Sequence, residues 1–150
     1  MGGDMNENMF DETKVEERLL RTAAIKAREM AYAPYSGFRV GAALLCGSGK
    51  VYSGCNIENA AYSPTNCAER TAFFKAVSEG ERSFNAIAIV GGSGEEPDGI
   101  CPPCGVCLQV MTEFCSPDDF TVYLVKSRDE SVALKLRDLL PYGFSSKNLD

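Results

Sequence analysis

Short apolar runs alternate with longer amphipathic segments along this chain, and this alternation leaves few folds open. Apolar residues recur at helical spacing in residues 13–31, and helices are also expected at residues 68–78 and 104–114. Five short apolar runs predict strands at residues 38–46, 51–57, 86–90, 120–125 and 132–136. Strands that are apolar on both faces need helices over both faces of their sheet. The sequence therefore predicts an α/β fold, a three-layer α/β/α sandwich with a mixed five-stranded sheet.

The chain of 150 residues is expected to form one domain over residues 13–150, after a flexible N-terminal tail at residues 1–12. No internal repeat or linker interrupts that domain. A chain of this length can bury a core without disulfides or a structural metal. A metal site in it is therefore expected to serve chemistry rather than folding.

The charge and cysteine content narrow the expected partners and the expected compartment. The net charge is −6 and the basic residues are dispersed, whereas binding to a phosphate backbone needs clustered positive charge. No apolar stretch is long enough to span a bilayer. The seven cysteines follow a polar N-terminus that does not look like a secretory signal. We therefore expect a cytoplasmic protein that binds neither nucleic acid nor membrane and keeps its thiols free or metal-bound.

The chain contains no histidine. This removes the most common general base and the Ser–His and Cys–His nucleophile pairs. A zinc site would have to be built from thiolates and carboxylates alone.

Cys104 and Cys107 stand three residues apart at the start of a predicted helix, so their side chains share one face. Zinc–sulfur bonds of ~2.3 Å would let one ion bridge both sulfurs, and the helix N-terminus favours thiolate. A lone pair of this spacing also fits a redox couple, and Cys101 forms a second such pair with Cys104 across two prolines. The other cysteines are expected to be small buried hydrophobic residues without a catalytic role: Cys46, Cys55 and Cys115.

Cys67 and Glu69 also open a predicted helix. Residues two apart do not share a helix face, but at the first turn, with Cys67 at the cap, both can reach one pocket. Three thiolates with an open fourth position is the arrangement of a catalytic zinc site, with Glu69 beside the metal rather than on it. Three thiolates and Zn²⁺ sum to a negative charge, which Arg70 could offset by donating hydrogen bonds to the sulfurs.

These motifs resemble the signature of the zinc-dependent cytidine deaminases of the small homotetrameric type. The resemblance covers roughly residues 14–148. It is carried by these segments: Ala33-Pro34-Tyr35-Ser36, Phe38-Arg39-Val40-Gly41-Ala42-Ala43, Gly54-Cys55-Asn56-Ile57-Glu58-Asn59-Ala60, Cys67-Ala68-Glu69-Arg70-Thr71-Ala72, Pro103-Cys104-Gly105-Val106-Cys107 and Leu139-Leu140-Pro141.

The resemblance implies hydrolysis of cytidine and 2′-deoxycytidine to uridine and 2′-deoxyuridine with release of ammonia, in pyrimidine salvage. Cys67, Cys104 and Cys107 would hold one zinc ion per chain, and a zinc-bound hydroxide would attack C4 of the base. Glu69 would take the proton of the water, deliver it to ring N3 and assist the departure of ammonia. Arg70 would support the thiolates.

The resemblance also implies a nucleoside site. Asn56 and Glu58 would hydrogen-bond the ribose hydroxyls, and their two-residue spacing at a strand end puts both side chains on one face. Phe38 would pack against the base, and the backbone of Ala68 would fix its edge. The pocket would be completed, in family members partly from a neighbouring subunit, by Tyr62 and Phe144.

One position departs from the family pattern: Leu108 stands where relatives often carry Arg. Arg70 would therefore have to neutralise more of the negative charge of the thiolates.

Three alternatives remain open from the residues alone. The zinc site could be structural in a binding module, Cys104 and Cys107 could be a redox pair, or the substrate could be a nucleoside antibiotic of the blasticidin S type. The segment from Asn56 to Asn59 and Arg70 favour cytidine.

Overall fold

The computed structural model describes residues 4–150, with side chains described from Glu12 onward. Five strands form one sheet: β1 (Arg39–Cys46), β2 (Val51–Cys55), β3 (Phe84–Gly92), β4 (Thr121–Val125) and β5 (Ser131–Lys135). Their order is β2-β1-β3-β4-β5, and β3 and β4 pair in parallel while the other neighbours are antiparallel. The predicted mixed five-stranded sheet is confirmed.

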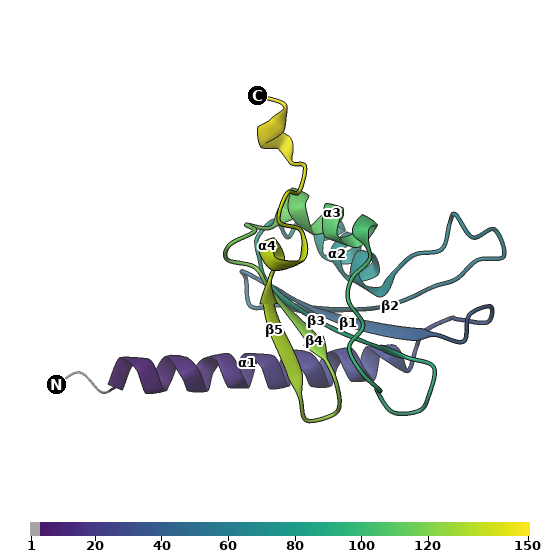
Figure 1. Ribbon diagram of the computed structural model, residues 1–150, viewed down its shortest axis with the longest axis horizontal. Coiled ribbons are helices and arrows are strands. Elements are labelled where there is room, and N and C mark those ends of the chain that lie inside the picture. Colours follow the sequence, from purple (N-terminus) through teal and green to yellow (C-terminus); the bar gives the residue numbers. More distant parts are fainter. Residues whose placement is uncertain (1–3) are drawn as a thin grey trace.

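Helices cover both faces of this sheet. The long helix α1 (Asp4–Arg28) crosses one face, while α2 (Ala68–Ser78), α3 (Gly105–Phe114) and the single turn α4 (Leu136–Leu139) lie over the other (Figure 1). A short 3-10 helix, η1 (Ser146–Asn148), ends the chain on an arm that extends from the body. The three-layer α/β/α sandwich is confirmed.

The element bounds differ from the sequence prediction mainly at the ends. Helix α1 begins at Asp4, within the segment predicted as a flexible tail, and ends at Arg28 rather than residue 31. The tail prediction also covers residues 1–3, which lie outside the described residues. Leu136 was expected to close the last strand and instead begins α4, where its backbone N–H donates to the carbonyl of Phe120.

Two separate apolar cores lie on the two faces of the sheet. Beneath α2 and α3 the core is aromatic, with Phe73 in contact with the rings of Phe84, Phe114 and Phe120. Beneath α1 larger side chains such as Leu20 and Tyr123 pack among several alanines, of which Ala43, Ala86 and Ala88 are fully buried strand residues. Small side chains let the axis of α1 approach the sheet closely.

Two strand glycines make the close approach of the helices possible. A Cβ atom on Gly41 would lie 2.1 Å from the carbonyl oxygen of Ala24 and 2.4 Å from the backbone nitrogen of Arg28. On the opposite face, a Cβ atom on Gly54 would lie 2.4 Å from the carbonyl oxygen of Ala68. Both contacts are with helix backbone, so α1 and α2 rest directly on the sheet at these positions.

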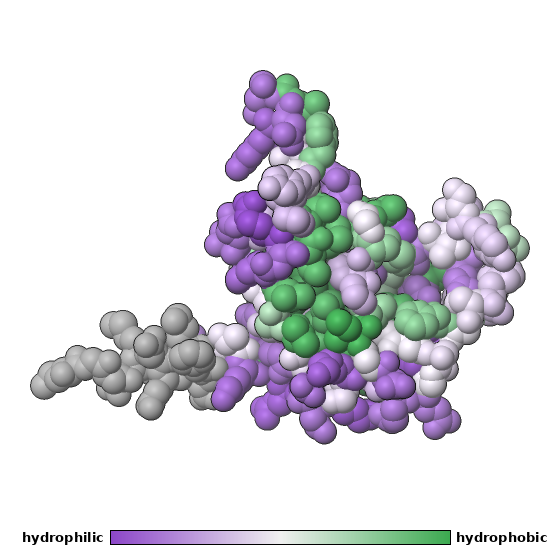
Figure 2. Space-filling model, in the orientation of Figure 1, coloured by the Kyte–Doolittle hydropathy of each residue, from purple (hydrophilic) through white to green (hydrophobic). Residues whose placement is uncertain are grey.

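Apolar side chains also gather on the surface over α3 and from there toward the sheet (Figure 2). Val106 on α3 is 57% exposed, and Phe144 and Leu149 on the C-terminal arm are exposed as well. Across residues 4–150, no helix combines the length and the hydropathy that a transmembrane segment requires.

Candidate metal centre

Two helix starts bring the three predicted cysteine ligands together. Cys67 is the N-cap residue of α2 and Cys104 is the N-cap residue of α3, each in an extended conformation and without a side-chain cap hydrogen bond. Cys107 lies one turn further along α3 and is buried. The positive ends of two helices therefore face the same group of thiols, which favours their thiolate forms.

The sulfur positions fit a zinc ion. The Sγ atoms of Cys67 and Cys104 are 3.8 Å apart, those of Cys104 and Cys107 are 3.5 Å apart, and all three lie within 4.8 Å of one another. Tetrahedral coordination with Zn–S bonds of ~2.3 Å requires sulfur–sulfur separations of about 3.8 Å. The three thiols thus already stand at the spacing that zinc coordination needs.

Charge and hydrogen bonding favour the thiolate of Cys67. The thiol of Cys107 and Nη2 of Arg70, which lies 3.4 Å from Cys67 Sγ, both donate to this sulfur and lower the pKa of Cys67 to about 5. Donation to Cys67 and burial raise the pKa of Cys107. The first negative charge of the cluster therefore resides on Cys67, beside the guanidinium of Arg70.

Glu69 lies in the first turn of α2 and is 4% exposed. Burial, which disfavours the charged carboxylate, raises its pKa to about 7. A carboxyl group with this pKa can both accept and release a proton near neutral pH.

A cleft of about 200 Å³ opens directly beside these residues. Its walls include Cys67, Glu69 and Cys104 together with the two predicted sugar-binding residues, Asn56 and Glu58. The remaining lining residues are Val40, Thr65, Asn66, Ala68, Cys101 and Pro102. The structure therefore brings most of the predicted site residues to one cavity.

The side chain of Asn56 hydrogen-bonds to the backbone around the start of β1. Its Oδ1 accepts from the N–H of Val40 and its Nδ2 donates to the carbonyl of Phe38, each over 2.8 Å. A side-chain amide has two donors and two acceptor lone pairs, so one donor and one acceptor remain for a ligand.

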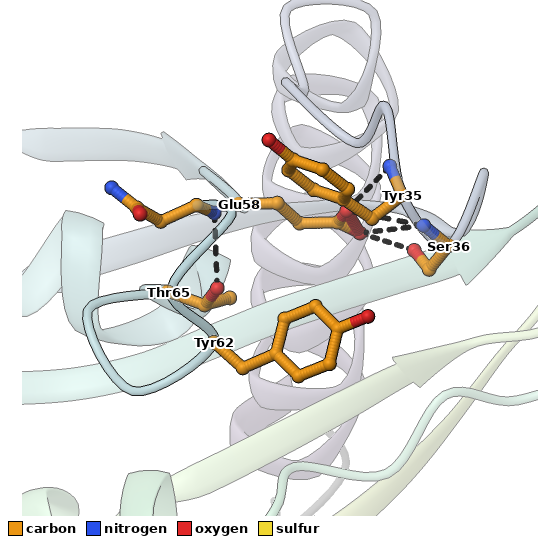
Figure 3. Close-up of a pocket in the computed structure, with 6 residues that line it drawn as sticks. Tyr35, Ser36, Glu58, Tyr62 and Thr65 are labelled. Atoms are coloured by element: carbon orange, nitrogen blue, oxygen red, sulfur yellow. Dashed lines mark hydrogen bonds between the residues drawn. The ribbon is translucent and has the colours of Figure 1, made fainter.

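Glu58 holds the loop at Tyr35 and Ser36. Its carboxylate accepts from the backbone N–H groups of both residues and from the Ser36 hydroxyl (Figure 3). The Ser36 hydroxyl, with help from the two N–H groups, lowers the pKa of Glu58 below its ordinary value. The ionised carboxylate is thus the form that shapes this side of the cleft.

Tyr62 lies in a neighbouring pocket rather than in the cleft beside the thiols. That pocket is lined by Tyr35, Ser36, Glu58, Asn59, Tyr62 and Thr65 (Figure 3). The ring centroids of Tyr35 and Tyr62 are 6.4 Å apart, with the two rings in an edge-to-face arrangement. Tyr62 is 78% exposed. Glu58 and Thr65 border both cavities.

Phe144 and Phe38 are not among the residues that line the cleft. Phe144 is on the C-terminal arm, where its carbonyl accepts from Nε2 of Gln109 on α3. Phe38 lies just outside, next to Cys101: a Cβ atom on Gly91 would lie 2.7 Å from Cys101 Sγ and 3.0 Å from Phe38 Cε1. Sequence reasoning gave Cys101 no place in the site, although its position three residues before Cys104 was a usable signal.

Comparison with known proteins gives the family. Residues 14–124 match the cytidine and deoxycytidylate deaminase zinc-binding region. The chain is similar to the cytidine deaminase of Sporosarcina psychrophila, with 54% identity over 124 residues that cover 83% of this chain and 88% of the relative. It is also similar to the cytidine deaminase of Halalkalibacterium halodurans, with 48% identity over 136 residues, which cover 91% and 99%.

A solved structure agrees with the sequence relatives. The crystal structure of a cytidine deaminase from Burkholderia pseudomallei matches with a TM-score of 0.76 and 49% identity, covering 84% of this chain and 97% of that one. The chain belongs to the cytidine and deoxycytidylate deaminase family of zinc-dependent hydrolases. The family predicted from the sequence and its zinc cofactor are thereby confirmed.

Proposed function

We propose that this protein hydrolyses cytidine and 2′-deoxycytidine to uridine and 2′-deoxyuridine with release of ammonia, in pyrimidine salvage. The observation that carries this proposal is the cluster of three thiols at the side of a cleft that also holds a buried carboxyl group with a raised pKa. The similar proteins described above are cytidine deaminases, which favours cytidine over an antibiotic of the blasticidin S type.

Cys67, Cys104 and Cys107 would hold one zinc ion per chain, as their sulfur spacing supports. When bound, zinc would supply a Lewis acid that makes a water molecule nucleophilic at neutral pH. Arg70 would stabilise the negative charge of the thiolates by donating to Cys67.

Glu69 would move the protons. Its carboxylate would take a proton from the attacking water and deliver it to N3 of the base. It would then take the second proton from the hydroxyl group newly bonded to C4 and deliver it to the departing amine, so that the C4 carbonyl forms as ammonia leaves. A pKa near 7 suits this double role, because neither the loss nor the gain of a proton is strongly uphill at neutral pH. The burial that sets this pKa also keeps bulk water away from the transfer.

The lining of the cleft supports a free nucleoside as the substrate. The remaining donor and acceptor of Asn56 and the carboxylate of Glu58 are suited to the hydroxyl groups of a sugar. No Lys or Arg is among the lining residues, whereas a phosphate would need a positive charge. Phe38 would pack on the base from its position beside Cys101, and the backbone of Ala68 would bind the base edge.

Tyr62 and Phe144 would reach a substrate only in an assembly of several copies. Both are aromatic, largely exposed and outside the cleft of their own chain, and apolar side chains gather on the surface over α3 (Figure 2). We therefore propose a homotetramer located in the cytoplasm, in which these residues complete the cleft of a neighbouring copy. Mass measurement under native conditions tests this, and a single monomer peak would rule it out.

The activity is tested by following the absorbance of cytidine in the presence of the purified protein, with the zinc content measured on the same sample. Steady loss of cytosine absorption with one zinc per chain is the expected result. Bound zinc without any reaction would contradict the proposed substrate. A zinc-free protein with a Cys104–Cys107 disulfide would instead favour the redox interpretation.

A further inference from the structure

Arg28, the last residue of α1, is only 4% exposed, and its guanidinium group is spread over four backbone carbonyls. Nε donates to the carbonyl of Arg39 over 3.1 Å, and Nη1 donates to that of Glu95 over 3.0 Å. Nη2 donates to the carbonyl of Gly92 over 2.7 Å and also to that of Gly94. One side chain therefore joins the end of α1 to the start of β1 and to the loop that follows β3.

The choice of acceptors distinguishes this group from an ordinary ion pair. The four hydrogen bonds described for the Arg28 guanidinium all end on carbonyl oxygens, not on a carboxylate. A carboxylate would hold the charge but would fix only one neighbour. The planar fork of arginine instead fixes the relative positions of several backbone segments, and a lysine ammonium cannot reproduce that geometry.

The segments that Arg28 joins are continuous with the two walls of the cleft. Arg39 lies between Phe38 and Val40, and Asn56 binds the backbone of both of these residues. Gly92 ends β3 and Glu95 lies in the connection from β3 to α3, which supplies Cys101, Pro102 and Cys104 to the opposite wall.

Cys101 and Phe38 also pack against the same strand residue, Gly91. A Cβ atom on Gly91 would lie 2.7 Å from Cys101 Sγ and 3.0 Å from a ring carbon of Phe38, so these groups have no free space between them. A shift of the loop at Gly92 would therefore move Cys101 relative to Phe38, and would move Cys104 through the two intervening prolines.

We propose that Arg28 is a positioning residue that fixes the spacing between residues 38–40, of which Val40 lines the cleft, and residues 101–104 on the opposite wall, and thereby controls zinc retention and closure of the cleft on the base. This inference depends on the proposed zinc site and substrate. Arg28 touches neither of them and acts through the backbone that it holds.

The test compares three variants. Arg28→Gln removes the fork, and Arg28→Lys keeps the charge without the fork. Arg21→Gln is the matched control, because Arg21 is also a buried arginine of α1, 7% exposed, but its ion pair is with Glu17 on the same helix. The thermal midpoints of all variants distinguish a general loss of stability from a loss of zinc retention at the site alone.

The first readout is the rate at which each zinc-loaded protein releases its metal to a coloured chelator. We expect Arg28→Gln and Arg28→Lys to release zinc about 10-fold faster than wild type, the lower end of the effect of supporting residues around metal sites. Arg21→Gln should release it at the wild-type rate even if its thermal midpoint falls equally. The second readout is the split between KM and kcat for cytidine, in which KM should rise more than kcat falls.

Equal release rates for Arg28→Gln and Arg21→Gln would overturn the inference, as would full recovery of the wild-type rate by Arg28→Lys. If Arg28→Gln does not fold, the comparison of Arg28→Lys with Arg21→Gln decides. A wild-type protein that binds no zinc would refute the proposed function itself, whereas a zinc-loaded, active wild type with insensitive variants would refute only the role of Arg28.

Discussion

Arg70 donates a hydrogen bond from Nη2 to Sγ of Cys67 over 3.4 Å, within the first turn of α2. The hydrogen bonds that Arg70 makes to the sulfurs of Cys67 and Cys107 in turn raise the pKa of the Arg70 guanidinium, so this group stays charged. Three thiolates around Zn²⁺ leave one net negative charge, which weakens the Lewis acidity of the metal. In the proposed site Arg70 would oppose this effect, and its Nε atom is buried without a described partner.

Leu108 follows Cys107 on α3 and packs into the apolar core, where it is 8% exposed. We expect Leu108→Arg to raise turnover per bound zinc, because a second guanidinium beside the thiolates would withdraw electron density from them. The same change should lower the thermal midpoint, since it places a charge at a buried position. Leu108→Met, which keeps the volume, should change neither quantity much. Unchanged or lower turnover in Leu108→Arg would contradict the idea.

Glu69→Gln should retain one zinc per chain and lose turnover by about 10²-fold or more, because an amide cannot carry the proton. Burial raises the pKa of Glu69, so folding disfavours its ionised form at and above neutral pH, and the neutral amide should not lower the thermal midpoint. Glu113→Gln on the exposed face of α3 is the matched control and should behave as wild type. A rate close to normal in Glu69→Gln would remove this residue from the mechanism.

Alkylation of the thiols at about pH 8 should respond to metal removal in a defined way. Chelation should expose three additional cysteines, Cys67, Cys104 and Cys107, to the reagent. Burial raises the pKa of Cys46 to about 11 and that of Cys115 to about 12, so both should stay unlabelled until the protein is unfolded. Mass spectrometry before and after chelation, and again in denaturant, measures each step. Labelling of Cys115 in the folded, zinc-loaded protein would contradict its buried position.

Gly54→Ala should lower the free energy of unfolding by about 2 kcal/mol or more, because the new Cβ would meet the backbone of α2 at Ala68 and at Ala72. Gly105→Ala is the contrasting change. Apart from its chain neighbours and the backbone of its own helix, no described atom lies within 4 Å of the position of its Cβ. Alanine also restricts the unfolded chain, so a gain of about 0.5–1 kcal/mol is expected. Chemical denaturation of the two variants measures both values. Equal stabilities would mean that α2 can move away from the sheet at no cost.

The sequence was most informative where a periodic pattern was bounded by clear start and stop residues. Helix α2 has the predicted bounds, Ala68–Ser78, because Cys67 caps it in an extended conformation and Gly80 follows with a φ of 100°. The start of α1 at Asp4 was missed. Met5 and Met9 stand four residues apart before Thr13, but they are separated by Asn6, Glu7 and Asn8, and asparagine is a weak helix former. The single turn α4 is too short to show a period of its own.

For the site, spacing predicted which residues could meet but not what else they bind. Cys67 and Glu69 share the cleft, as expected from a cap position followed by a first-turn residue. Asn56 and Glu58 hydrogen-bond to the backbone near residues 35–40, which lies far from them in sequence. These bonds depend on how that segment folds back, so a local sequence pattern cannot predict them. Arg28 was missed for a related reason: a charged residue at the end of an amphipathic helix has the pattern of a surface residue whether or not it is buried.

The two helices that carry the thiols begin without the side-chain caps that usually stabilise such ends. Ser, Asp or Asn in place of Cys67 or Cys104 would be a better helix start by roughly 1 kcal/mol. At these two positions selection for a stable fold and selection for a working site oppose each other, so a library screened for heat resistance alone would tend to discard the enzyme's metal. The two cysteines keep the protein less stable than it could be, because the metal site needs their thiols.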